Sequence, residues 1–126
     1  MGIKPVITGS ISLSDVRVPE DNIIGELNKG FYYSLEYYDK SRISIAAQAV
    51  GIAQGAFERA LSYAKERKQF GRPIIQFQGI SFKLADMATK IEAARLLTYK
   101  AAWLYDQGKV DPMATSMAKR TQAEPP

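Results

Sequence analysis

Two long stretches of apolar residues at three- and four-residue spacing, separated by Gly71 and Pro73, constrain the fold of this chain more than any other feature. Such spacing places apolar side chains on one face of an α-helix. The first pattern runs from about residue 28 to 68 and the second from about 75 to 107. Gly71 and Pro73 end the first helix, and a short connection favours antiparallel neighbours. We therefore expect a mainly α chain built on two long antiparallel helices.

The first helix is apolar on two faces, with only a narrow polar stripe between them. The stripe consists of Ser44, Gln48, Gly51, Gly55, Glu58, Ser62 and Lys65. One apolar face carries Ile43, Ala46, Val50, Ala53, Phe57 and Leu61, and the other carries Ile45, Ala49, Ile52, Ala56 and Ala60. A helix that is apolar around most of its circumference is normally buried, yet one chain offers only one full-length neighbour. We therefore expect association into a dimer or tetramer that completes helical bundles.

The second helix has a single apolar seam and a clear end. The seam consists of Phe77, Ile80, Leu84, Met87, Ile91, Ala94, Thr98, Ala101 and Tyr105. Gly108 is a natural stop, and Asp111 followed by Pro112 is typical of an N-cap and a first helical position. A third, short helix is therefore expected to begin there.

Residues 1–27 differ from the rest of the chain. Residues 7–14 alternate apolar with small or polar side chains, as a half-buried strand does, and residues 16–18 continue the alternation before a turn at Pro19. One or two strands do not form a stable sheet alone. We expect a short β-like N-terminal tail, the remnant of a larger β-domain and its linker, ahead of a helical-bundle domain over residues 28–126.

The composition excludes several kinds of site. The chain has no cysteine and no histidine, so disulfides, thiolate nucleophiles, imidazole catalysis and His or Cys metal sites are absent from it. The net charge of +4 is spread along the chain without a basic stripe. The longest uncharged stretch, Ile43 to Phe57, is shorter than the roughly 20 residues of a membrane span. We expect a soluble, cytoplasmic protein with no nucleic-acid, membrane or metal partner.

The break between the two helical patterns holds the strongest candidate for a binding site. An arginine fork at Arg67 suits pyrophosphate oxygens, the ring of Phe70 suits an aromatic ring, and the amide of Gln78 suits a polar edge. This combination suits a flat, anionic cofactor. The alternative is an arginine at the negative end of a helix, a core phenylalanine and a solvated glutamine.

A second candidate site lies near the start of the first helix. Four tyrosines occur between positions 32 and 38, and Asp39 and Arg42 follow at helical spacing. Tyr38, Asp39 and Arg42 could form a cleft wall that binds a ligand amide or hydroxyl. Alternatively they are an ordinary ion pair beside tyrosines at the edge of a core. No pair of carboxylates forms an evident acid–base couple, and there is no glycine-rich phosphate loop.

Several of these segments resemble one known family. Residues 15–25, 30–31, 38–42, 56–78, 84–87 and 101–103 are similar to the end of the middle β-domain and the first part of the C-terminal helical domain of acyl-CoA dehydrogenases. The resemblance covers nearly the whole chain. It implies a C-terminal-type helical bundle and a flavin-dependent α,β-dehydrogenation of acyl-CoA thioesters, in which a glutamate removes the α-proton and the flavin accepts the β-hydride.

The resemblance also assigns tasks to particular residues. Positions matching Arg67, Phe70 and Gln78 reach the FAD of a neighbouring subunit in the family. Positions matching Tyr38, Asp39 and Arg42 line the acyl-CoA site.

The resemblance assigns no catalytic residue to this chain. The catalytic glutamate of most family members lies in a part of the enzyme that this sequence omits, and the other position used for it holds Ser41 here. We expect a partial acyl-CoA dehydrogenase that is inactive as an isolated chain. The alternative is a non-enzymatic helical oligomerisation module derived from such an enzyme, and nucleic-acid binding is a third, weaker interpretation.

Overall fold

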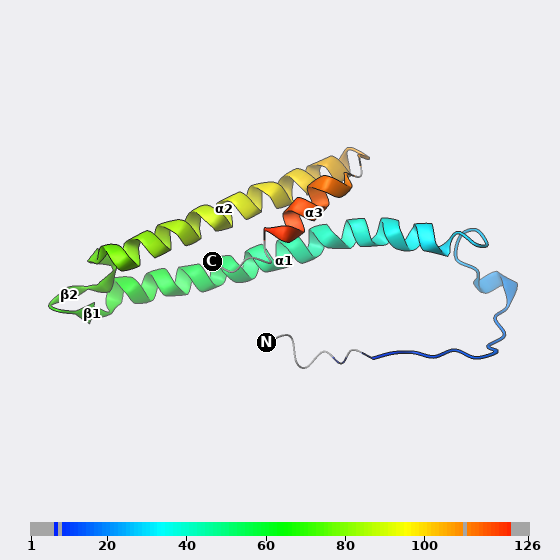
Figure 1. The fold of residues 1–126 in the computed structure, drawn as a ribbon, viewed down its shortest axis with the longest axis horizontal. Coiled ribbons are helices and arrows are strands. Elements are labelled where there is room, and N and C mark those ends of the chain that lie inside the picture. Colours follow the sequence, from blue (N-terminus) through cyan, green and yellow to red (C-terminus); the bar gives the residue numbers. More distant parts are fainter. Residues whose placement is uncertain (1–6, 8, 110, 122–126) are drawn as a thin grey trace. The chain divides into compact units, whose positions relative to one another are not determined.

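The computed structural model describes residues 7, 9–109 and 111–121 and is mainly helical (Figure 1). The chain divides between Phe31 and Tyr32 into two compact units. The elements, in chain order, are η1 (Glu20–Asn22), α1 (Gly30–Glu66), β1 (Lys68–Gln69), β2 (Arg72–Pro73), η2 (Ile74–Gln76), α2 (Gln78–Asp106) and α3 (Pro112–Arg120).

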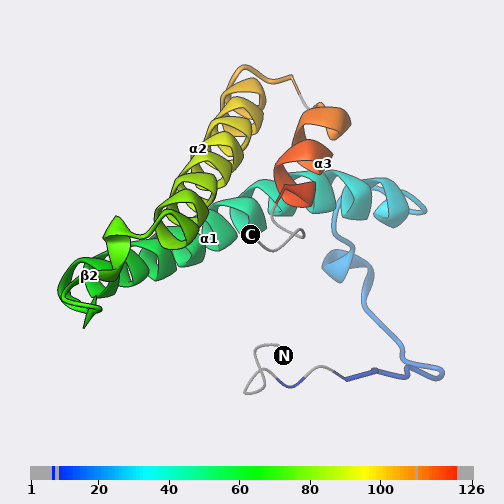
Figure 2. The ribbon, with the colours of Figure 1, turned by 60° about the vertical axis from the view of Figure 1, so that its left-hand side comes forward.

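In the second unit, α1 and α2 form the expected antiparallel pair, and α3 folds back toward them (Figures 1 and 2). The three helices meet around a cluster of small buried side chains. This cluster consists of Ala46 on α1, Ala101 on α2, and Ala114 and Ala118 on α3, with Ile43 and Leu104 packed against it. Small side chains allow helix backbones to approach closely, and this brings α3 into contact with both long helices.

The expected apolar seam of α2 is confirmed. Each of its nine residues is buried or half-buried, and Leu84, Ala94, Thr98 and Ala101 are the most enclosed. Thr98 is accommodated because its hydroxyl donates a hydrogen bond of 2.8 Å to the carbonyl oxygen of Ala94, one turn earlier. The seam therefore contains a polar residue without leaving that residue unsatisfied.

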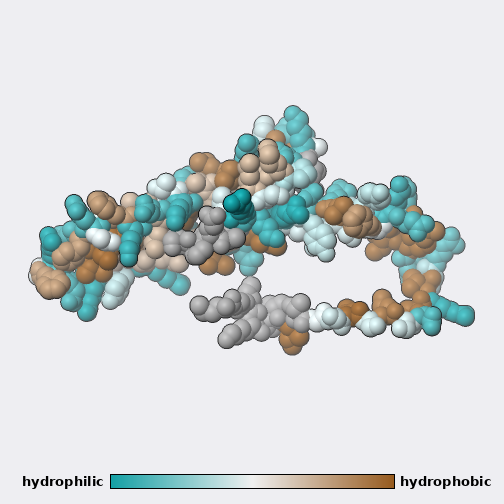
Figure 3. All heavy atoms as spheres, viewed as in Figure 1, coloured by the Kyte–Doolittle hydropathy of each residue, from teal (hydrophilic) through white to brown (hydrophobic). Residues whose placement is uncertain are grey.

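Only one of the two apolar faces of α1 is covered. The face from Ile43 to Leu61 is buried or half-buried, as expected. On the opposite face, Ile45 and Ile52 remain 49% and 65% exposed. The single chain therefore covers only one side of α1, as expected for a helix with one full-length neighbour, and burial of the other face by association stays a prediction. Apolar side chains are visible on the outer surface of the helices, among polar ones (Figure 3).

A polar link joins the middle of α1 to α2. The guanidinium Nη2 of Arg95 donates a hydrogen bond of 2.8 Å to Oε1 of Gln54. Each partner is held on its own helix, since Arg95 Nε lies 3.3 Å from Oε2 of Glu92 and Gln54 Nε2 donates to Oε1 of Glu58 at 2.7 Å. A polar contact between two largely apolar faces favours one alignment of the helices over alignments that are shifted along the helix axis.

The ends of α2 and α3 follow the expected signals. Gly108 adopts a left-handed conformation, with φ of 70°, just after α2. Oδ1 of Asp111 accepts hydrogen bonds from the backbone N–H groups of Met113 and Ala114, at 2.9 and 3.2 Å. Pro112 is the first residue of α3. The expected N-cap is therefore confirmed.

In the first unit, the alternating pattern does not produce a strand. Among the described residues before η1, none is assigned to a strand. A strand requires a neighbour with which its backbone can form hydrogen bonds, and this segment pairs with none in the described structure.

None of the helices over the described residues has a stretch both long and apolar enough to cross a bilayer.

The cap of α3 gives a direct test of this packing. We expect Asp111→Ala to lower the free energy of unfolding by about 1 kcal/mol, because two helix N–H groups lose their acceptor. Asp111→Asn is the matched control, since asparagine caps about as well as aspartate. Urea denaturation followed by circular dichroism measures both variants. Equal losses for the two substitutions would contradict the capping role.

Candidate functional site

The connection between α1 and α2 is a tight β-hairpin with a strained tip. In the ladder of β1 and β2, Gln69 pairs with Arg72, which leaves Phe70 and Gly71 as a two-residue turn. Both have positive φ angles, 51° and 79°, as a type I′ turn requires. Glycine adopts this conformation freely, but a bulky residue does so at a cost of roughly 1–3 kcal/mol. The hairpin therefore holds Phe70 in an unfavourable backbone conformation.

The ring of Phe70 extends from this turn into solvent. It is 92% exposed, which rules out the alternative of a core phenylalanine within this chain. Its one aromatic neighbour among the described residues is Phe77, in an edge-to-face arrangement with centroids 6.2 Å apart. The guanidinium carbon of Arg72 lies 4.3 Å from the centroid of Phe77, a cation–π distance. Arg72, Phe77 and Phe70 thus form a continuous group of side chains at the hairpin.

The backbone fixes both other predicted cofactor residues close to this hairpin. The N–H of Arg67 donates to the carbonyl oxygen of Tyr63 at 2.8 Å, and its own carbonyl accepts from the N–H of Ile74 at 2.9 Å. Gln78 is the first residue of α2. Both side chains are exposed, and Arg67 forms no ion pair with any residue in the described ranges. The structure therefore brings Arg67, Phe70 and Gln78 together at one end of the helix pair.

The second predicted group lies far from the first. Nη1 of Arg42 is 2.6 Å from Oδ1 of Asp39, and both side chains are partly buried. Tyr38 packs edge-on against Tyr37 with centroids 6.2 Å apart. From Arg42 to Arg67 the helix rises by roughly 37 Å at 1.5 Å per residue. The two predicted groups therefore lie toward opposite ends of α1.

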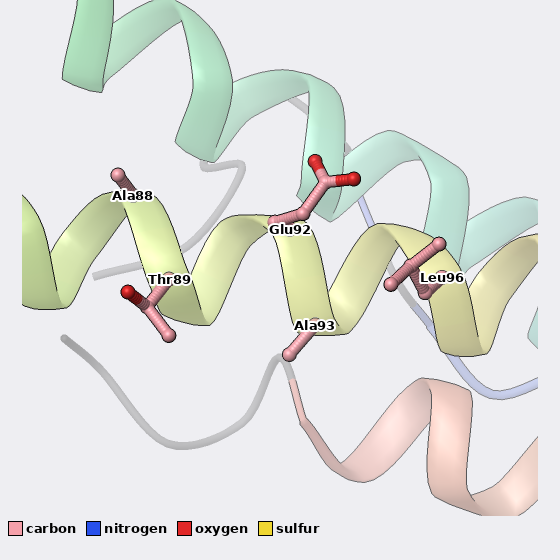
Figure 4. Close-up of a pocket in the computed structure, with 5 residues that line it drawn as sticks. All are labelled: Ala88, Thr89, Glu92, Ala93 and Leu96. Atoms are coloured by element: carbon pink, nitrogen blue, oxygen red, sulfur yellow. The ribbon is translucent and has the colours of Figure 1, made fainter.

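One surface hollow lies on α2 and contains none of the predicted residues. It has a volume of about 510 Å³ and is lined by Ala88, Thr89, Glu92, Ala93 and Leu96 (Figure 4). All five belong to one helix, and the single charged side chain, Glu92, already pairs with Arg95. This hollow is a shallow surface of small residues without a set of converging polar groups.

A second hollow involves one predicted residue and three that sequence reasoning missed. It has a volume of about 340 Å³ and is lined by Arg42, Ser116, Lys119 and Arg120. Arg42 belongs to α1 and the other three to α3. The sequence signal for the missed residues is their spacing, which places them on one side of a short helix. Arg72 and Phe77 were also missed as site residues. Their position beside Phe70 depends on the register of the hairpin, which the sequence alone does not give.

No metal centre emerges from the described residues. Over residues 7, 9–109 and 111–121, no three acidic side chains gather closely enough to hold a metal ion. The chain has no histidine or cysteine to supply other ligands.

The exposed side chains at the hairpin have the chemistry to bind a ligand that has both an aromatic and an anionic part.

Comparison with known proteins gives consistent matches along the chain. The family model described as "Acyl-CoA dehydrogenase, C-terminal domain" matches residues 28–124. The probable acyl-CoA dehydrogenase YngJ of Bacillus subtilis is 52% identical over 124 residues, which are 98% of this chain and 33% of that protein. Subunit CarC of the caffeyl-CoA reductase-Etf complex of Acetobacterium woodii is 50% identical over 119 residues, 94% of this chain and 31% of that protein.

Solved structures agree with the sequence matches. Butyryl-CoA dehydrogenase from Megasphaera elsdenii superposes with a TM-score of 0.83 at 50% identity, over 86% of this chain and 28% of that one. The chain therefore spans about a third of the length of the curated relatives that it matches. The family model spans the residues of the helices and the hairpin, so the described fold is that of the acyl-CoA dehydrogenase C-terminal domain.

The strained turn predicts a gain in stability when Phe70 is replaced. We expect Phe70→Asn to raise the free energy of unfolding by about 1 kcal/mol, because asparagine followed by glycine is favoured in a type I′ turn. Phe82→Asn, on the exposed side of α2, is the control and should not stabilise the chain. Denaturant titration measures both. A loss of stability in Phe70→Asn would show that the ring stabilises the fold.

Proposed function

The chain belongs to the acyl-CoA dehydrogenase family, and from this premise we propose that it supplies flavin and acyl-CoA contacts to an enzyme that forms an α,β double bond in acyl-CoA thioesters. The observation that carries the proposal is the exposed Phe70, held in a strained turn beside Arg67 and Gln78. Strain of this kind persists at binding sites, where the geometry of a side chain matters more than local stability.

The cofactor that we propose is FAD. The residues at the hairpin fit its parts: an aromatic ring at Phe70 for the flavin, a guanidinium at Arg67 for the pyrophosphate, and an amide at Gln78 for a polar edge. Gln78 also begins α2, where the helix dipole favours an anion. The bound flavin would accept the hydride. The chain's own residues would bind and orient that cofactor and exclude water around it.

We propose that the acyl-CoA contacts come from Tyr38, Asp39 and Arg42. The ion pair between Asp39 and Arg42 fixes the carboxylate, whose free lone pairs can accept a hydrogen bond from an amide N–H of the pantetheine arm. The phenol of Tyr38 is more than half exposed and can form part of the cleft wall. These residues position the substrate, and we assign the proton abstraction to none of them.

The distance between the two groups supports a homo-oligomeric site. A hydride transfer requires flavin and substrate in contact, yet the two groups are separated by roughly 37 Å along α1. A flavin at the hairpin of one chain and a substrate near Arg42 of the same chain could not meet. Contact becomes possible if the hairpin serves the substrate site of a second chain. The uncovered face of α1, with Ile45 and Ile52, offers a surface for such an association.

A second candidate function is a non-enzymatic helical oligomerisation module. The same uncovered face of α1 favours it, because burying that face requires no cofactor. The two candidates differ in whether the hairpin residues still bind flavin. Retention of flavin by the purified chain would count against the module.

Flavin retention is therefore the first experiment. The purified chain is saturated with FAD, desalted, and examined by visible absorbance. We expect a retained flavin band, and we expect Arg67→Ala to reduce the retained flavin about tenfold or more, since one charge-assisted hydrogen bond is lost. Arg59→Ala, which removes an exposed arginine from α1 ahead of the hairpin, is the matched control. A colourless protein, or equal retention in both variants, would contradict a cofactor site at the hairpin.

Activity gives a separate outcome. We expect the isolated chain not to oxidise acyl-CoA with an electron acceptor, because no residue in it is assigned as the base. Enzyme-like oxidation by the purified chain would overturn this part of the proposal. Such activity would also mean that one of the carboxylates on the helices of this chain acts as the base.

Self-association is tested on the uncovered face of α1. We expect Ile52→Glu to weaken association by on the order of 3 kcal/mol, because an unpaired carboxylate would be buried in the interface. Gln48→Glu places the same charge on the polar stripe of α1 and should leave association unchanged. Sedimentation equilibrium measures both. A monomeric unmodified chain would exclude both the shared site and the module.

A further inference from the structure

The hollow between α1 and α3 collects positive charge from two distant parts of the sequence. Arg42 lies on α1, while Ser116, Lys119 and Arg120 lie three and four residues apart on α3 and share one side of that helix. Ala46 of α1 and Ala114 and Ala118 of α3 belong to one buried cluster with Ala101 of α2, which places the two helices near each other at this point. Figure 2 shows α3 lying beside the first half of α1. The hollow is thus built by tertiary structure.

The residues that line this hollow are mostly cationic. Three of its four lining residues are cations and none is acidic. The carboxylate of Asp39 lies on α1 outside the lining of the hollow and pairs with Arg42. Lys119 forms no ion pair with any residue that the structure describes. Like charges gathered in one hollow repel one another, and an anion between them would relieve that repulsion.

The dipole of α3 explains part of this gathering of cations, but not all of it. Lys119 and Arg120 occupy the last turn of α3, where cations stabilise the helix through its dipole. That effect requires only α3. It does not account for Arg42 on the opposite wall, or for the hydroxyl of Ser116 on the same side as the two cations. Convergence of side chains from two helices is typical of a binding site.

We propose that this hollow binds an oxyanion of the phosphate class. Arg42 and Arg120 present guanidinium forks, Lys119 a point charge, and Ser116 a hydroxyl that can donate to a phosphate oxygen. The hollow has a volume of about 340 Å³ and is open to solvent, so a hydrated phosphate group can reach its lining residues. Chemically, the oxyanion is either free phosphate or a phosphate group of the nucleotide end of coenzyme A; the second source rests on the proposed function.

The test uses the purified 126-residue chain and three probes in isothermal titration calorimetry. The probes are inorganic phosphate, adenosine 3′,5′-bisphosphate, and adenosine as the uncharged comparison. We expect both phosphates to bind and adenosine not to bind. We expect Lys119→Gln to weaken phosphate binding about tenfold, as loss of a charge-assisted hydrogen bond does. Lys90→Gln removes the same charge from an exposed position on α2 and should leave binding unchanged.

The outcomes separate this proposal from the proposed function. Tighter binding of the bisphosphate than of inorganic phosphate, with both sensitive to Lys119→Gln, supports a nucleotide source. Equal binding of the two supports a free-phosphate site, which would stand even if no flavin is retained. Absence of phosphate binding at millimolar concentration, or equal weakening by Lys119→Gln and Lys90→Gln, overturns the site. Circular dichroism confirms that the helices persist in each variant.

Discussion

The two-residue turn at Phe70 and Gly71 fixes how α2 lies against α1. A shorter or longer connection would move every side chain of the α2 seam relative to the covered face of α1. The hydrogen bond from Ile74 N–H to the carbonyl of Arg67 closes the base of this connection, and the contact between Arg95 and Gln54 lies more than two helical turns away in the same alignment. The alanine cluster that docks α3 depends in turn on this pairing, and so does the hollow beside it.

Sequence reasoning predicted the features that depend on local spacing. The α2 seam through Leu84, Ala94 and Ala101, and the N-cap at Asp111, are each specified within a few neighbouring residues. It could not decide which apolar face of α1 is covered, because both faces have suitable side chains and only the tertiary arrangement selects one. Sequence reasoning also overestimated the strand character of the N-terminal tail, because the alternating pattern there has no strand partner in the described structure.

In the candidate site, too, local spacing predicts some features and only the tertiary structure decides the others. Arg67, Phe70 and Gln78 could be grouped because all lie within twelve residues of one another at a helix break. The exposure and backbone strain of Phe70 could not be foreseen, since they follow from the ladder register that places it at the first turn position. The hollow between α1 and α3 joins Arg42 to Lys119, 77 residues later. No local pattern indicates that pairing, because it depends on the tertiary cluster that Ala46 shares with Ala114 and Ala118 of α3.

The alanine cluster has a consequence for how the chain opens. Alanine loses no side-chain conformational entropy on folding, so docking α3 through Ala114 and Ala118 requires little ordering. It also removes little apolar area from water, so the docked state is only slightly favoured. α3 is therefore suited to detach by itself while α1 and α2 stay paired, as a separate unit of local unfolding. Its amide protons would then exchange with solvent well before those of the long helices, and the charged wall that α3 contributes would be assembled and dismantled on that faster timescale.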